Sequence, residues 1–238
     1  MVSKNQRKQI LQLKQKKYRL KSGLFVAEGE KVVEELLSAS WECLSLFSIA
    51  SHFHPQSVEI DTAIMKQLTH FKSPSPVLGV FNIPESKPLL SQKITIAVDG
   101  VSDPGNLGTI IRLCDWFGLS QLICSAKTVD CYNPKVVQAS MGSIVRVECH
   151  YVADLSKTLI NFNKPIYGAD LEGQSLYNTP FEEEISIVFG SESHGLSEAI
   201  EKQVKKITIP NFRSGRGAES LNVATSSAIF LSEIFRSR

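Results

Sequence analysis

The sequence of 238 residues lacks any apolar run long enough to cross a membrane. Its longest run, around residues 44–50, is short and broken by serines, whereas a spanning helix needs about 18 or more apolar residues in succession. The basic N-terminus is not followed by the apolar segment and cleavage site of a secretory signal. We therefore expect a cytoplasmic protein with no membrane partner.

Cysteine is scarce and shows no metal-binding spacing. The five cysteines are odd in number and contain no CxxC pair, which favours reduced, mostly buried thiols; they are Cys43, Cys114, Cys124, Cys131 and Cys149. His52 and His54 form the only close histidine pair in the sequence, and no further ligand lies at a usable spacing. We expect no metal site.

Acidic residues are absent from residues 1–21, which hold eight of the 26 basic residues and none of the 24 acidic ones. Such a segment is typical of a solvated helix face or a flexible tail. It is also typical of a phosphate-binding arm, because clustered Lys and Arg neutralise phosphates and release counterions. Charge alone slightly favours the first interpretation. Tyr18 inside the basic run, together with the motifs described below, favours an RNA-binding arm.

The first part of the chain is predicted to be a small α/β unit. A loose apolar stripe indicates one helix over residues 4–21, ended by Gly23. Short strands and helices follow up to Phe81, among them a helix that Asp61 can cap. Pro84-Glu-Ser-Lys-Pro88 has two prolines and no apolar periodicity, so it is the best linker candidate.

After the linker, strands alternate with helices, which predicts a mostly parallel sheet covered on both faces. No internal repeat or low-complexity tract interrupts this pattern. The predicted strands and helices, in order, are strand 94–98, helix 108–117, strand 121–124, helix 134–141, strands 145–147, 166–169 and 185–189, helix 197–204, strand 206–209 and helix 221–235.

The first motif, residues 99–112, follows a buried strand. The chain turns through Pro104-Gly105, and Asn106 and Gly108 lead into a helix that carries Arg112. Ligands of open parallel sheets bind beyond the carboxyl ends of strands, and Arg112 lies about one helical turn past Gly108. Taken alone, the segment is more typical of a Pro-Gly turn and a surface arginine. It does not form G-x-G-x-x-G, so no dinucleotide fingerprint is present.

The second motif, residues 188–195, also follows a buried strand. Gly190 lets backbone approach a ligand closely, and Gly195 relieves a tight turn. Glu192 lies between them and could bind a ribose hydroxyl or favour a cationic ligand, although a solvated loop glutamate is the commoner case. His194 is interpreted as a loop residue rather than a catalyst.

The third motif combines Ile209-Pro210 at a strand end with Ser220-Leu221-Asn222 at a helix start. Ser or Asn at this point satisfies free N–H groups as a helix cap. Exposed N–H groups at a helix N-terminus also suit a carboxylate or phosphate. The intervening loop, Phe212-Arg-Ser-Gly-Arg-Gly217, is basic and suitable for phosphate contact.

Together, and in this order, the three motifs resemble the signature motifs of the SpoU (TrmH-like) 2′-O-ribose RNA methyltransferases of the SPOUT superfamily. The resemblance is strongest over residues 94–235. A weaker part, residues 25–36, resembles the L30e/L7Ae-like substrate-binding domain that often precedes the catalytic domain. The resemblance implies an L30e-like RNA-binding domain with a basic N-terminal arm at residues 1–88. It implies a SPOUT methyltransferase domain at residues 89–238, an α/β fold with a mostly parallel sheet and a deep C-terminal trefoil knot.

The resemblance also implies the reaction and its residues. S-adenosylmethionine is the implied cofactor, held by Gly190, Ile209 and Leu221, and a homodimer is the implied assembly. The implied catalytic residues are Arg112, Asn106, Glu192, Ser220 and Asn222. The family assigns Arg112 the activation of the ribose 2′-hydroxyl. Because a guanidinium has a pKa above about 12, we favour stabilisation of the developing alkoxide or the neighbouring phosphate, and a base role stays open.

Two alternatives remain at this stage. One is a catalytically inactive RNA-binding protein of the same fold, which the intact motif residues disfavour. The other is a nucleotide-using enzyme of ordinary doubly wound topology, which lacks a phosphate fingerprint here. The sequence does not distinguish transfer RNA from ribosomal RNA as the substrate.

Overall fold

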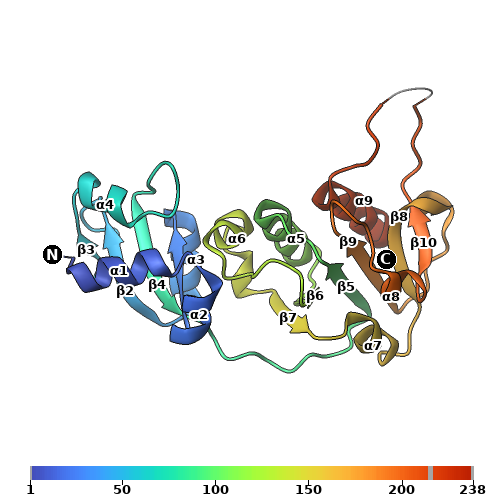
Figure 1. Cartoon of the computed structure of the whole chain (residues 1–238), viewed down its shortest axis with the longest axis horizontal. Coiled ribbons are helices and arrows are strands. Elements are labelled where there is room, and N and C mark those ends of the chain that lie inside the picture. The colour runs from blue at the N-terminus through green and yellow to red at the C-terminus, as the bar shows by residue number, and fades with distance from the viewer. Residues whose placement is uncertain (1, 214–216, 237–238) are drawn as a thin grey trace. The chain divides into compact units, whose positions relative to one another are not determined.

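The computed structural model describes residues 2–213 and 217–236, which form two compact units (Figure 1). The first unit contains the chain up to Glu85 together with Asp130–Val145. The second contains Ser86–Val129 and the chain from Arg146 onward. Residues 130–145 thus pack with the first unit although they follow the linker. The division of function between residues 1–88 and 89–238 stays a prediction.

The first unit is built on a four-stranded sheet with the order β1-β4-β2-β3. β4 is antiparallel to β1 and β2, and β3 is parallel to β2. The strands are β1 (Leu24–Glu28), β2 (Cys43–Ser48), β3 (Val58–Glu59) and β4 (Val77–Asn82). The helical segments are α1 (Lys4–Gln12), α2 (Lys16–Ser22), α3 (Glu30–Ser38), α4 (Thr62–Leu68), α6 (Pro134–Ser140) and the 3-10 turn η1 (Ser143–Val145).

The N-terminal segment belongs to the core of this unit. Ile10 and Leu13 are buried and pack in one cluster with Met65, Leu68 and Leu78. Because α1 contributes apolar side chains to the core, its basic residues are carried on a fixed helix and not on a flexible tail.

The single helix predicted for residues 4–21 is wrong, because the chain breaks between α1 and α2. Leu13 caps α1. α2 runs from Lys16 to Ser22 and is capped by Gly23, which lies in the left-handed region at φ 67°. The carbonyl oxygens of Leu13 and Lys14 instead accept hydrogen bonds from Nη1 of Arg19, at 2.8 and 3.0 Å. Arg19 is 2% exposed, so seven of the eight basic residues of this segment, and not all of them, are exposed.

The second unit is built on a six-stranded sheet with the order β10-β8-β9-β5-β6-β7. Every pairing in it is parallel, as the alternation of strands and helices predicts. The strands are β5 (Ile94–Asp99), β6 (Gln121–Ser125), β7 (Glu148–Val152), β8 (Ile166–Ser175), β9 (Ile185–Gly190) and β10 (Lys205–Thr208). The helical segments are α5 (Pro104–Trp116), α7 (Leu155–Ile160), α8 (Glu198–Glu201), α9 (Val223–Arg236) and the 3-10 turn η2 (Leu176–Asn178).

Several predicted elements need correction. α5 begins at Pro104 and not at Gly108, because Asp103 accepts the N–H of Asn106 as an N-cap and Pro at the first position has a helical φ already. The strand predicted at residues 145–147 is wrong: η1 ends there and β7 starts at Glu148. α7 was not predicted, and α8 is shorter than the helix predicted for residues 197–204.

Within residues 2–213 and 217–236, no helix is long and apolar enough to span a membrane. The same residues hold no cluster of three or more His, Cys, Asp or Glu side chains that could bind a metal ion. None of the five cysteines, all of which lie within the described residues, forms a disulfide bond.

Candidate active site

The three motifs lie at neighbouring strand ends in the second unit. β5 and β9 pair directly, with Asp99 opposite Gly190 at their carboxyl ends. The buried carboxylate of Asp99 accepts the backbone N–H of Ser197 through Oδ2 at 2.8 Å. The first motif is thereby fixed to the segment that follows the second one, at the edge of the sheet where parallel sheets bind ligands.

A chain of side-chain hydrogen bonds joins one residue from each motif. Nδ2 of Asn106 donates to Oε1 of Glu192 at 2.7 Å, and Nδ2 of Asn222 donates to Oδ1 of Asn106 at 2.8 Å. The second carboxylate oxygen of Glu192 accepts the backbone N–H of Ser102 at 3.4 Å. We call Glu192, Asn106 and Asn222 the motif-bridging chain. Three of the five predicted catalytic residues are brought together in this way.

The direction of the motif-bridging chain follows from its two ends. At one end, Oδ1 of Asn222 accepts the backbone N–H groups of Ala224 and Thr225 at 2.9 and 3.2 Å, so its amide nitrogen must face Asn106. At the other end, an ionised Glu192 can only accept hydrogen bonds. Both amide orientations are therefore fixed by chemistry, which holds the three side chains in one geometry.

Local sequence explains the position of each member. Asp103 caps α5, and this places Asn106 in the first helical turn at the strand end. Asn222 caps α9, so the helix-cap interpretation of the third motif is confirmed for Asn222. Ser220 is exposed and does not contribute a hydrogen bond among the described residues. In the sequence, the dipeptide Asp103-Pro104 indicates the start of α5.

The close approach of neighbouring backbone requires a glycine at position 190. A Cβ placed on Gly190 would lie 2.2 Å from the carbonyl carbon of Gly195 and 2.5 Å from the backbone nitrogen of Leu196. The loop closes on itself through paired hydrogen bonds between Ser191 and Gly195, at 2.9 and 3.0 Å. Gly195 itself has φ +65°. The second motif is therefore a tight loop of fixed shape that presents Glu192 to Asn106.

We expect Gly190→Ala to disturb this loop. The added methyl group has no space against backbone atoms, and overpacking of this kind costs about 1–3 kcal/mol. Urea denaturation monitored in the far ultraviolet measures the loss. An unchanged unfolding midpoint would contradict the fixed-loop geometry.

Arg112 lies apart from the motif-bridging chain. It is exposed on α5 and makes no hydrogen bond to another described side chain. Arg112 follows Asn106 by six residues, and at about 100° per residue the two side chains leave the helix about 120° apart. The long side chain is exposed to solvent, and its catalytic role stays a prediction.

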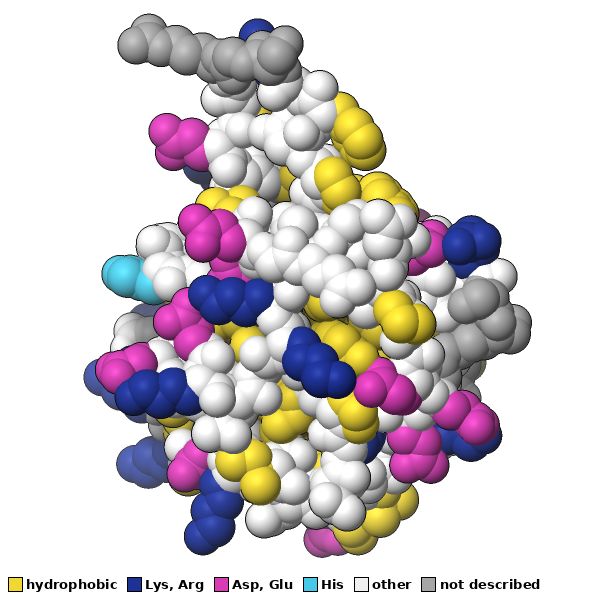
Figure 2. All heavy atoms as spheres, turned by 90° about the vertical axis from the view of Figure 1, so that its right-hand side faces the viewer, with side chains coloured by type: hydrophobic (Ala, Val, Ile, Leu, Met, Phe, Trp, Pro, Cys, Tyr) yellow, Lys and Arg dark blue, Asp and Glu magenta, His cyan; other side chains and the backbone are white. Residues whose placement is uncertain are grey.

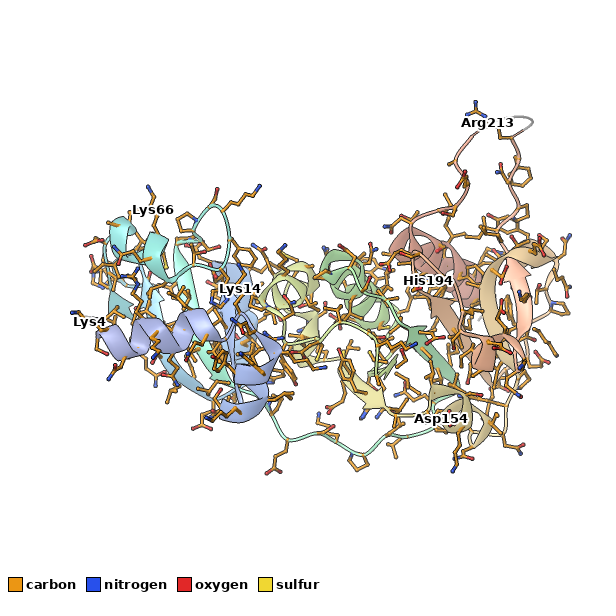
Figure 3. All side chains as sticks on the ribbon, viewed as in Figure 1. Lys4, Lys14, Lys66, Asp154, His194 and Arg213 are labelled. Atoms are coloured by element: carbon orange, nitrogen blue, oxygen red, sulfur yellow. The ribbon has the colours of Figure 1, made fainter. Side chains whose placement is uncertain are left out.

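The predicted cofactor residues differ in exposure. Ile209 follows β10 and is half-buried, whereas Leu221 precedes α9 and is 48% exposed. An apolar side chain exposed beside polar strand-end loops fits an adenine ring, which needs apolar contact and backbone hydrogen bonds. The residues thus fit S-adenosylmethionine in kind. Residues 214–216 of the basic loop lie outside the described residues, while Arg213 is described and exposed (Figure 3).

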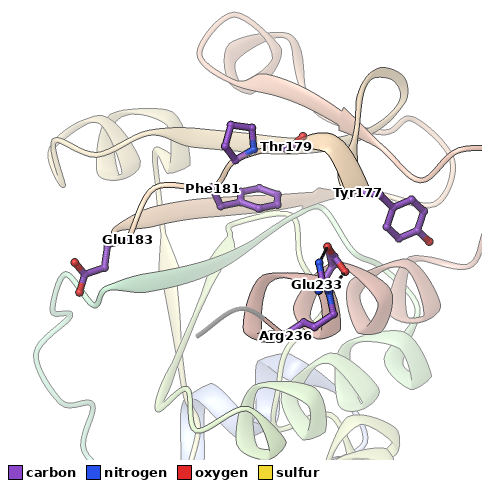
Figure 4. Close-up of a pocket in the computed structure, with 7 residues that line it drawn as sticks. Tyr177, Thr179, Phe181, Glu183, Glu233 and Arg236 are labelled. Carbon is purple, nitrogen blue, oxygen red and sulfur yellow. Dashed lines mark hydrogen bonds and ion pairs between the residues drawn. The ribbon is translucent and has the colours of Figure 1, made fainter.

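Other features of the second unit do not compete for this role. The hollow in Figure 4 is lined by Tyr177, Phe181 and neighbouring residues, among them Arg236, which is paired with Glu233 at 2.8 Å. None of the eight predicted site residues lines it.

The face in Figure 2 interleaves basic with acidic side chains. Burial raises the pKa of Cys114 to about 12, so this thiol on α5 is not a thiolate nucleophile.

Comparison with known proteins identifies the family. The sequence pattern of the SpoU rRNA Methylase family matches residues 93–232, and that of the MRM3-like substrate binding domain matches residues 4–79. The 23S rRNA (guanosine(2553)-2′-O)-methyltransferase RlmP of Bacillus subtilis (strain 168) is 30% identical over 245 residues, which cover 96% of each chain.

Solved structures agree. A protein from Porphyromonas gingivalis, described as an RNA methyltransferase of the TrmH family, superposes with a TM-score of 0.88 at 37% identity over the full length of both chains. An S-adenosylmethionine-bound rRNA methyltransferase from Sinorhizobium meliloti superposes with a TM-score of 0.83 at 26% identity, covering 100% of this chain and 97% of that one. The predicted SPOUT fold class is confirmed, and the chain belongs to the SpoU rRNA methylase family.

Proposed function

We propose that this protein transfers the methyl group of S-adenosylmethionine to a ribose 2′-hydroxyl of ribosomal RNA, as a homodimer in the cytoplasm. Membership of the SpoU family makes it an S-adenosylmethionine-dependent RNA 2′-O-ribose methyltransferase. Ribosomal RNA is favoured over transfer RNA because RlmP, a full-length relative, acts on 23S rRNA by name. Five cysteines without a disulfide bond suit a reducing compartment.

The observation that carries the proposal is the motif-bridging chain. It joins the three motifs at the strand ends through hydrogen bonds of 2.7 and 2.8 Å. In this arrangement the buried parallel strands hold polar side chains in fixed positions at one edge of the sheet. An inactive RNA-binding protein has no need for such fixed positions. The chain thereby supports an active enzyme over the inactive alternative.

Positioning supplies much of the acceleration in such a reaction. The cofactor supplies a methyl group on a sulfonium centre for in-line displacement. In our proposal, Asn106 and Asn222 orient the reacting ribose, Glu192 fixes Asn106, and Ser220 shapes the loop before α9. Arg112 stabilises the developing alkoxide or the neighbouring phosphate. Gly190, Ile209 and Leu221 hold the cofactor, chiefly through backbone.

We expect the full-length protein to bind S-adenosylmethionine with micromolar-range affinity, on the order of −8 kcal/mol. Isothermal titration calorimetry measures this, with NAD and ATP as comparison ligands. The doubly wound alternative predicts the reverse order of affinities. Absence of heat with S-adenosylmethionine and its demethylated product at high protein concentration would contradict the proposed function.

A further inference from the structure

A groove lies between α1 and α2 in the first unit, and the methyltransferase site does not use it. Most of the surface that the groove exposes is apolar, and polar and basic side chains supply the rest. The groove has a volume of about 510 Å³, and the side chains that give it its chemistry are Lys8, Gln9, Gln12, Tyr18 and Lys21. Figure 3 labels Lys4 on α1 and Lys14 in the turn between α1 and α2. The volume of the groove falls in the range of binding sites for small molecules.

The lining of the groove matches the parts of a nucleotide. Lys8 and Lys21 are exposed ammonium groups, and none of the described residues that line the groove carries a carboxylate. Gln9 and Gln12 each offer an amide donor and an acceptor, as the polar edge of a base requires. Tyr18 offers an aromatic face, and stacking on such a face is the general way in which unpaired bases are held.

The groove is held in shape by buried contacts. Ile10 and Leu13 anchor α1 in the core, and the carbonyl of Ile10 is hydrogen-bonded to Nε2 of His70 at 2.8 Å. On the other side, Arg19 links the end of α1 to Asp130, with Nε 2.8 Å from Oδ2. The angle between the two helices is therefore fixed before any ligand binds, and a fixed site has less entropy to lose on binding.

Tyr18 is placed by its neighbours as well. The ammonium group of Lys17 lies 4.9 Å from the centre of its ring, and the Ser22 hydroxyl donates to the Tyr18 carbonyl at 2.8 Å. The ring is half-buried. The side chain of a half-buried tyrosine has less conformational freedom than that of a fully exposed one, so less freedom is lost when a base stacks on the ring.

We propose that this groove binds a nucleotide segment of the RNA substrate, with Lys8 and Lys21 on the phosphates, a base stacked on Tyr18, and Gln9 and Gln12 on the edge of that base. The proposal rests on the proposed function for the identity of the substrate. It assigns to α1 and α2 a defined subsite for an unpaired nucleotide and not a diffuse attraction between charges.

The test compares two double variants of equal charge. Lys8→Gln with Lys21→Gln removes the groove cations, and Lys31→Gln with Lys66→Gln removes two exposed lysines of the same unit that do not line the groove. Binding of deproteinised large-subunit ribosomal RNA is measured from about 0.05 to 0.3 M KCl. Each lost phosphate contact reduces the salt slope by about 0.7 and the affinity at 0.1 M salt roughly 5-fold.

We expect the groove variant to lose affinity roughly 25-fold, with a salt slope smaller by about 1.4, and the control variant to change much less. Equal losses in the two variants would overturn the proposal, because they indicate diffuse attraction. Tyr18→Ala should weaken binding about 5-fold or more, as loss of one stacked base does, and Tyr18→Phe should retain it. Equal competition by polyglutamate of the same charge would also overturn the proposal.

The same variants separate this proposal from the proposed function. We expect their affinity for S-adenosylmethionine and their kcat at saturating RNA to stay at the wild-type values, while KM for RNA rises. A wild-type protein that binds RNA through the groove but transfers no methyl group would overturn the function and support the groove. A wild-type protein that methylates RNA with no dependence on the groove would do the opposite.

Discussion

Replacing Arg112 by alanine is expected to slow methyl transfer about 100- to 1000-fold, the loss typical of one charge-assisted contact to a developing oxyanion. The affinity for S-adenosylmethionine should barely change, because backbone atoms of the second and third motifs are proposed to hold the cofactor. Single-turnover methyl transfer to large-subunit ribosomal RNA measures the rate, and calorimetry measures cofactor binding.

Two further variants sharpen this prediction. Arg112→Lys keeps the charge but loses the planar guanidinium, so it should rescue the rate poorly. Lys157→Ala removes an exposed cation from α7 in the same unit and should leave the rate unchanged. If Arg112→Ala methylates RNA at the wild-type rate, Arg112 is a helix-surface residue and the active-site assignment is wrong.

Replacing Asp130 by alanine is expected to destabilise the first unit by about 3–5 kcal/mol, because the substitution leaves a buried charge without its partner. Arg19 is 2% exposed and Asp130 13% exposed in their side chains. The pair holds residues 130–145 against α2, and Arg19 also binds the carbonyls at the end of α1. Without the Arg19–Asp130 ion pair, we expect the turn between α1 and α2 to lose its fixed conformation.

The two tryptophans allow this loss to be measured in the first unit alone. Trp41 lies there, with its ring 5.9 Å from that of Phe25, whereas Trp116 lies in the second unit and is 85% exposed. In a Trp116→Phe background, urea denaturation monitored by fluorescence reports on Trp41. The double variant Arg19→Met with Asp130→Leu should lose less than the two single losses added together. Strict additivity would show that the pair is not coupled.

Deletion of residues 1–21 is not a clean test of RNA binding for the same reason. It would remove Ile10 and Leu13 from the core and Arg19 from its ion pair. Substitution of the exposed lysines leaves these contacts in place, which is why the groove experiment uses Lys→Gln variants.

Sequence patterns predicted the second unit well where burial is continuous. β5 and β9 are buried along almost their whole length, and continuous apolar runs are typical of parallel strands. The break between α1 and α2 could not be predicted, because residues 13–15 contain neither proline nor glycine. Arg19, which binds the carbonyl groups at this break, pairs with Asp130, 111 residues away in the chain. No local sequence pattern indicates such a distant partner.

The candidate site shows the same division. The motif resemblance selected Asn106, Glu192 and Asn222, but their mutual hydrogen bonds span 86 and 116 residues and depend on the order of strands in the sheet. Spacing along α5 suggested that Arg112 faces the same crevice as Gly108. The structure adds that Arg112 is exposed and separate from the motif-bridging chain, and its catalytic role stays a prediction.

Mapping the transferred methyl group shows whether this protein is an RNA 2′-O-ribose methyltransferase. The protein is incubated with S-adenosylmethionine and large-subunit ribosomal RNA from cells that lack it, with transfer RNA from the same cells in parallel, and the products are analysed by nucleoside mass spectrometry and alkaline hydrolysis. We predict a single 2′-O-methylated nucleotide in the ribosomal RNA, resistant to alkaline cleavage and lost with Arg112→Ala. A methyl group on a base, or no transfer to either RNA by a protein that binds the cofactor, would contradict the account.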